Sequence, residues 1–95
     1  MIKKTKKINF LKLAKRAAEI ASDKKGLDIL ILNVNRLTTF AEYFVIVTVE
    51  SHPQLMAVSK EITSTFKQEE DCAPIHAECH KNSDWFAIDY AGLII

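Results

Sequence analysis

Glycine and proline are scarce in this sequence, with two residues of each among 95. So few of them provide neither a flexible linker nor the glycine-rich loops that cradle nucleotide phosphates, which excludes P-loop and dinucleotide-binding enzymes. Two cysteines do not form a disulfide framework, so a reducing, cytoplasmic compartment is expected. The length fits one hydrophobic core and excludes an enzyme with a cleft between two lobes.

Long apolar runs are also missing near the N-terminus. Lys12, Lys15 and Arg16 interrupt the apolar stretch that follows the basic start. A signal peptide needs about 7–15 consecutive apolar residues, and a membrane-spanning helix needs about 18 or more. We therefore expect no targeting segment and no membrane contact.

Charge is divided unevenly along the chain. Residues 1–25 carry nine basic side chains against two acidic ones, a net +7, whereas residues 26–95 carry four against ten, a net −6. We expect residues 1–7 to be a basic flexible tail and residues 8–95 to be a single domain. The acidic part favours a basic protein surface as partner. The basic arm could be a solvated helix face or an auxiliary phosphate contact, and it lacks the interleaved aromatic residues of a dedicated RNA-binding surface.

Periodicity predicts the first half of the fold. A helical pattern begins at Asn9, and Gly26 is a suitable left-handed residue to end it. Strands are predicted at 28–34 and 43–49. Both are apolar on their two faces, as a central strand covered on both sides would be.

The second half begins with a helix. Ser51 can cap it and Gln54 can return the bond, and the pattern ends near Glu69. Three further strands are predicted at 75–79, at 85–90 and from 93 onward, with a turn at 81–84 between the first two. The order α-β-β-α-β-β-β predicts an α/β (α+β) fold, with a mixed sheet of about five strands and two main helices.

A zinc site is the first chemistry to consider, because two cysteines and two histidines lie within nine residues: Cys72, His76, Cys79 and His80. Their spacing matches none of the usual structural zinc patterns. His76 and Cys79 also fall on opposite faces of the predicted strand. The favoured interpretation is a strand with one buried thiol and two exposed imidazoles, so no metal and no cofactor are expected.

Catalytic patterns are similarly weak. Ser51 is adjacent to His52 but is explained as a helix cap, and adjacent residues do not give an aligned nucleophile and base. Asp84 and Asp89 would face opposite sides of one strand, so they do not form a carboxylate pair. We predict no catalytic residues and therefore no enzyme.

Trp85 is the only tryptophan, and it shares a strand face with Asp89. Two interpretations are open for it. Trp85 could pack under the first helix, or it could be an exposed aromatic beside an acid. The second arrangement is typical of an anchor for a basic protein partner.

Five segments of the sequence resemble the Iojap, or ribosomal silencing factor S, family in order and spacing: 28–34 (DILILNV), 42–48 (EYFVIVT), 51–54 (SHPQ), 77–78 (AE) and 85–90 (WFAIDY). The resemblance covers about residues 8–95. It implies a fold related to the nucleotidyltransferases but without their catalytic carboxylates, and no cofactor.

The resemblance also implies a function. Proteins of this family bind the large ribosomal subunit through a basic ribosomal protein on its subunit-joining face, and they block docking of the small subunit. Translation is thereby repressed. An alternative is an RNA-contacting accessory factor of ribosome assembly that acts through the basic N-terminal helix and its lysines. A third reading, a nucleotidyltransferase-type enzyme with an unusual site, lacks the expected ligands.

The resemblance implies a partner-binding surface on matching positions: Glu42, Tyr43, Trp85, Asp89 and Tyr90. Trp85 and Asp89 are the expected hot spots, and Tyr90 supports them from the opposite strand face.

The sequence departs from the family pattern in several places. Glu42 stands where the family usually has Asp, and Ala91-Gly92 replaces a Gly-acid pair. The family normally continues through the last strand, whereas this sequence stops at Ile95. We expect this to leave an apolar edge strand open, which could pair with a second copy to form a homodimer.

Overall fold

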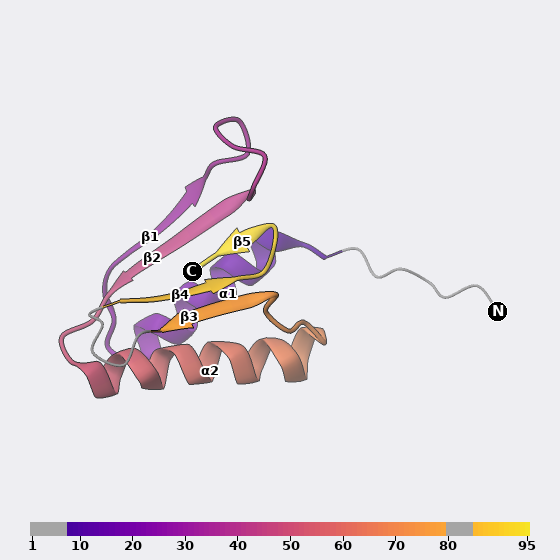
Figure 1. Cartoon of the computed structure of the whole chain (residues 1–95). Helices are drawn as coiled ribbons and strands as arrows, with labels where there is room; N and C mark the ends of the chain where they lie inside the picture. The colour runs from indigo at the N-terminus through magenta and orange to yellow at the C-terminus, as the bar shows by residue number, and fades with distance from the viewer. Residues whose placement is uncertain (1–7, 80–84) are drawn as a thin grey trace.

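The computed structural model describes residues 8–79 and 85–95, which form two helices and a five-stranded mixed sheet (Figure 1). The elements follow in the order α1 (Phe10–Asp23), β1 (Leu27–Asn33), β2 (Tyr43–Thr48), α2 (His52–Glu70), β3 (His76–Cys79), β4 (Phe86–Asp89) and β5 (Leu93–Ile94). The predicted α+β class and element order are confirmed. The predicted tail at 1–7 and turn at 81–84 lie outside the described residues.

The strands lie in the order β1-β2-β5-β4-β3. β2 and β5 are parallel, and the other neighbouring pairs are antiparallel. The last strand therefore lies in the middle of the sheet, and the predicted open edge at the C-terminal strand is wrong. The physical reason is the connection between β2 and β5. It contains α2 and a β3–β4 pair, which is long enough to bring the chain back parallel to β2.

Each helix begins at a side-chain cap. The Asn9 carboxamide oxygen accepts a hydrogen bond from the Lys12 N–H at 3.1 Å, and Ser51 Oγ accepts one from the Gln54 N–H at 3.2 Å. Gln54 Oε1 accepts from the Glu50 N–H at 2.8 Å, one residue before the position that a capping box would use. These caps explain why α1 and α2 begin where the sequence predicts.

Both helices cover the same face of the sheet, and the core lies between them and that face. Val45 of β2, Ile88 of β4 and Leu93 of β5 pack there against apolar residues of α1 and α2. The neighbouring residues along each strand point to the other face. The prediction that 28–34 and 43–49 are covered on both sides is wrong, because the two helices cover one face only, and β1 is in addition an edge strand.

Gly26 has a different role from the predicted one. The left-handed residue after α1 is Lys25, with φ of 69°, and Gly26 does not have a positive φ. A Cβ on Gly26 would lie 2.7 Å from Val47 Cγ1 and 2.8 Å from the Ala21 carbonyl oxygen. Glycine is required here because α1 and β2 approach its backbone closely.

Candidate partner-binding surface

The open face of the sheet, opposite the helices, is the strongest candidate for a binding surface. Cross-strand pairing aligns one row of residues over all five strands: Leu32, Phe44, Ile94, Asp89 and His76. Directly paired residues lie on the same face of a sheet. The row therefore runs from apolar side chains on β1, β2 and β5 to polar ones on β4 and β3.

A second row repeats this arrangement. Leu30 pairs with Ile46, and Ala87 pairs with Glu78. Leu30 is 51% exposed and Ile46 is 46% exposed. Adjacent exposed apolar side chains with polar residues beside them are typical of a protein interaction site. We call this surface, formed by Leu30, Leu32, Phe44, Ile46, Ala87, Asp89, Ile94, His76 and Glu78, the open sheet face.

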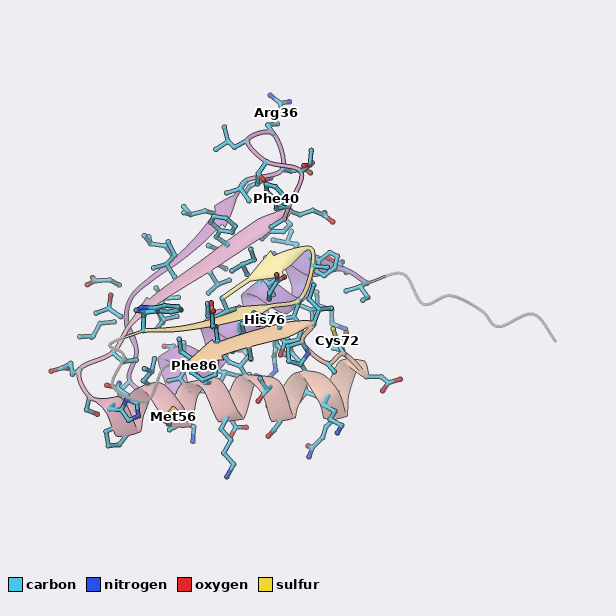
Figure 2. The ribbon with its side chains drawn as sticks, viewed as in Figure 1. Arg36, Phe40, Met56, Cys72, His76 and Phe86 are labelled. Carbon is cyan, nitrogen blue, oxygen red and sulfur yellow. The ribbon has the colours of Figure 1, made fainter. Side chains whose placement is uncertain are left out.

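Trp85 directly precedes Phe86, the first residue of β4. Strand alternation puts it on the same side as Ala87, and 49% of the residue is exposed. Phe86 points the other way. Figure 2 shows it over α2 near Met56, and the two residues line one surface depression. Of the two interpretations of Trp85, the structure therefore favours an exposed position away from the first helix.

Asp89 combines a structural contact with a surface position. Its Oδ1 accepts a hydrogen bond from the Ala91 N–H at 2.8 Å, which stabilises the turn where Ala91 has φ of 73°. Its backbone carbonyl accepts from the Ile75 N–H at 2.8 Å. The side chain is still partly exposed on the open sheet face. The carboxylate is thus held in a fixed position at the surface.

Tyr90 lies in the core, with 3% of the residue exposed. Its ring centroid is 5.0 Å from that of Phe66 on α2. Burial raises the pKa of the Tyr90 hydroxyl well above its usual range, and nearby Cys72 adds to this. Tyr90 can therefore support the surface from beneath, while its side chain is not accessible to a partner.

The other two predicted residues lie where β2 begins. Glu42 is exposed, and its backbone N–H donates to the Gly92 carbonyl at 2.8 Å. The Tyr43 N–H donates to the same carbonyl at 3.1 Å, and the Tyr43 side chain is half-buried against the core. Glu42 and Asp89 both line a depression around Gly92, whereas Trp85 lies at the opposite end of β4.

Sequence reasoning missed the apolar part of the open sheet face. The sequence predicts that Leu30, Leu32 and Ile46 belong to strands covered on both sides, because apolar residues occur on both faces of those strands. A signal was present, since the sequence predicts only two helices, and two helices cover one face of a five-stranded sheet. The exposed side chains of the connection between β1 and β2 were also missed. Figure 2 shows Arg36 and Phe40 projecting there.

Two of the five basic residues in the described part of the basic arm, Lys12 and Arg16, are paired with acids. Lys12 Nζ lies 3.4 Å from Glu70 Oε2, and Arg16 lies 3.2 Å from Glu69 and 2.7 Å from Glu19. The hydrogen bond from Arg16 holds the pKa of Glu69 below its usual value. These contacts connect α1 to the end of α2, and they reduce the charge that the arm offers to phosphates.

Metal binding has no geometric support among the residues that the structure describes, because no group of three histidine, cysteine, aspartate or glutamate side chains could hold an ion there. His80 and the side chain of Cys79 fall outside that set. Cys72 is buried, and burial raises the pKa of its thiol. Neither described helix is long and apolar enough to cross a membrane.

Comparison with known proteins identifies the family. A family model described as "Ribosomal silencing factor during starvation" matches residues 7–95. The chain belongs to the ribosomal silencing factor (RsfS) family. One relative, the ribosomal silencing factor RsfS of Chromobacterium violaceum, is 25% identical over 83 residues, which are 87% of this chain and 67% of that protein.

Solved structures share the fold. A crystal structure of a Chromobacterium violaceum protein has a TM-score of 0.84 at 23% identity, over 92% of this chain and 72% of that one. A crystal structure of a Bacillus halodurans protein has a TM-score of 0.71 at 25% identity, over 90% of this chain and 75% of that one. The α+β arrangement of this RsfS family member is thus also found in these two proteins.

Proposed function

We propose that this protein silences ribosomes by binding the large subunit through the open sheet face and blocking association with the small subunit. The family membership supports a ribosomal role. The observation that carries the binding mode is the exposed apolar part of the open sheet face, next to acidic residues on β3 and β4. The mechanism is steric and needs no catalytic residue.

The proposed partner is a basic ribosomal protein on the intersubunit face. Leu30 and Ile46 would form the dry centre of the contact, and Trp85 would anchor one end of it. Asp89, with Glu42 nearby, would meet basic side chains of the partner. Tyr43 and Tyr90 would hold the strands in place from within.

The site of action follows from the partner. A factor that occludes ribosomal subunits works in the cytoplasm, where the subunits meet. The alternative, RNA contact through the basic arm, is not favoured by the described residues, because Lys12 and Arg16 are in ion pairs with glutamates. It would show a steep loss of affinity with added salt.

The test is co-sedimentation of the protein with isolated large subunits, small subunits and joined ribosomes, at two salt concentrations. We expect pelleting with large subunits only, and a lower yield of joined ribosomes when the protein is added first. Trp85→Ala should weaken large-subunit binding by about 2 kcal/mol or more, as loss of an interface aromatic typically does. Pelleting with small subunits or joined ribosomes to the same extent would contradict the proposal.

Two matched variants sharpen this test. Asp89→Asn removes the charge but keeps the oxygen that accepts from Ala91, so binding should fall while the melting temperature stays near that of the wild type. Leu37→Ala changes an apolar residue that is 83% exposed in the β1–β2 connection, outside the open sheet face, and should leave binding unchanged. If Leu37→Ala weakened binding as much as Trp85→Ala does, the surface would be wrongly assigned.

A further inference from the structure

β1 forms one edge of the sheet. It is the first strand in the order β1-β2-β5-β4-β3, so β2 pairs with one of its sides and no described strand pairs with the other. Figure 1 shows β1 along the outside of the sheet. β2 separates it from β5, so this edge is formed by the first half of the chain alone.

The backbone of β1 directs hydrogen-bonding groups away from the sheet. The Val34 N–H donates to the Glu42 carbonyl at 2.9 Å, which directs the backbone of Val34 toward β2. In an antiparallel strand this direction alternates from one residue to the next. Ile31 and Asn33 therefore direct both N–H and C=O toward the open edge, and Ile29 directs its carbonyl there. Such a row of groups can pair with a further strand.

This edge lacks most of the features that usually prevent sheets from pairing. Those features are lysine or proline on the edge, a very short strand, or a bulge. Residues 29–33 contain no charge and no proline. Asp28, with φ of 49°, lies in the shifted part of the register and disturbs only the start of β1. The opposite edge, β3, has four residues and includes His76 and Glu78, so β1 is the edge better suited to accept a strand.

The side chains of β1 fit a second copy of the same strand. A two-fold axis at Ile31 places this residue opposite its own copy, and it places Ile29 opposite Asn33, so the outward backbone groups meet. On the open sheet face, Leu30 of each copy lies opposite Leu32 of the other. Leu30, Ile31 and Leu32 are 51%, 37% and 40% exposed, so the pairing would cover apolar side chains on both sides of the strand.

We propose that two copies of this chain pair through β1, antiparallel and about a two-fold axis at Ile31, to form one continuous sheet. The occupant is a second copy because one sequence supplies matching backbone groups and apolar side chains on both sides of the axis. Each copy uses β1 once, so the assembly closes at two copies and does not grow into a filament. The proposal does not rest on the proposed silencing function.

Sedimentation equilibrium of the full chain tests the pairing. We expect a reversible equilibrium between monomer and dimer. Leu30→Lys/Leu32→Lys places like charges opposite each other across the axis and should weaken the dimer at least roughly tenfold. Leu30→Lys/Leu32→Glu places opposite charges there and should associate at least roughly tenfold more tightly than the double-lysine variant. A wild type that stays monomeric at every concentration, or equal association of the two double variants, would overturn the proposal.

A variant on the neighbouring strand separates edge pairing from the packing of two open sheet faces against each other. Ile46 lies beside Leu30 on the open sheet face, but it belongs to β2, inside the sheet. Ile46→Lys should therefore leave the dissociation constant of the dimer nearly unchanged. If it weakened the dimer as much as the double-lysine variant does, the copies would be associating through their faces, and the assignment to the edge would be wrong.

Disulfide formation tests the register. In a chain with Cys79→Ser, where the remaining Cys72 is buried, Ile31→Cys should form a disulfide between copies under mild oxidation. The two Cα atoms of residue 31 would lie about 5.5 Å apart, within reach of a disulfide. Asn33→Cys in the same background is the control, because its two copies would lie about 14 Å apart. Equal cross-linking of the two variants, with both folded by circular dichroism, would contradict the register.

Discussion

At the scale of single residues, the Tyr90 hydroxyl is an unusual feature of the core. It is buried and has no hydrogen-bond partner among the described residues. A buried hydroxyl without a partner loses its hydration and typically costs about 1–3 kcal/mol. The ring contact with Phe66 and the buried area of the ring oppose this cost. Tyr90 is therefore held in the core by the packing of its ring, and its hydroxyl makes no stabilising hydrogen bond with the described residues.

We expect Tyr90→Phe to leave the protein as stable as the wild type or to stabilise it by up to about 1 kcal/mol, because it removes the unpaired hydroxyl and keeps the ring. Tyr90→Ala should destabilise by about 3 kcal/mol or more through loss of that ring. Urea denaturation measures both changes. A clear loss of stability in Tyr90→Phe would show that the hydroxyl has a partner. Large-subunit binding by Tyr90→Phe should not change.

At the scale of elements, acidic residues at the end of α2 are fixed by basic residues of α1. Glu69, Glu70 and Asp71 close α2, where negative charge opposes the helix dipole. Arg16 makes two hydrogen bonds to Glu69, through Nε and one terminal nitrogen, each of 3.2 Å, and Lys12 contacts Glu70. The sequence shows these charges as separate runs, and only helix packing brings them together.

The pKa of Glu69 is lowered in the folded state, mainly by its hydrogen bond with Arg16. A lowered pKa means that the pair stabilises the fold above the ordinary glutamate pKa, of about 4.3, and that this contribution is lost as the pH falls through the lower folded value. We therefore expect Glu69→Gln to lower the melting temperature at pH 7 and to have a smaller effect at about pH 3.

Gln68→Ala is a suitable control for this prediction, because Gln68 is uncharged and exposed on the same turn of α2. The difference in melting temperature between Gln68→Ala and the wild type should be the same at pH 7 and at about pH 3, unlike the difference for Glu69→Gln. If the melting temperatures of the wild type and Glu69→Gln differed equally at both pH values, the ion pair would not be the source of the effect.

At the scale of the whole molecule, the sheet has one covered and one open face, and this asymmetry can be tested on one strand. Val45 is 2% exposed and faces the helices, whereas its neighbour Ile46 is 46% exposed. Leu30 on β1 pairs with Ile46. Apolar side chains that remain half-exposed contribute little to folding, so their presence is better explained by a partner than by the core.

We expect the double variant Leu30→Thr/Ile46→Thr to change the free energy of unfolding by less than about 1 kcal/mol and to weaken large-subunit binding strongly. Val45→Thr, on the same strand with the opposite orientation, should destabilise by about 2 kcal/mol, because it buries a hydroxyl in the core. Denaturation and co-sedimentation separate the two effects. A double variant that unfolds as easily as Val45→Thr would contradict the open-face assignment.

The sequence alone determined the elements, because their signals are local. Asn9 and Ser51 cap helices through contacts three residues away, and the alternation of residues 85–90 identifies β4 and its buried face. The positions of Trp85 and Asp89 on the same side of that strand follow from the same period of two. Segment motifs were also sufficient to place the chain in its family.

Only the tertiary structure decided which strands are neighbours and which faces are covered. β5 lies between β2 and β4, and β1 lies at an edge, because strand order depends on contacts between residues far apart in the sequence. The same contacts bury Tyr90, expose Leu30 and Ile46, and pair Arg16 with Glu69. A run of apolar residues indicates that a strand can be buried on both faces. Whether a helix covers the second face depends on how the elements pack in the tertiary structure.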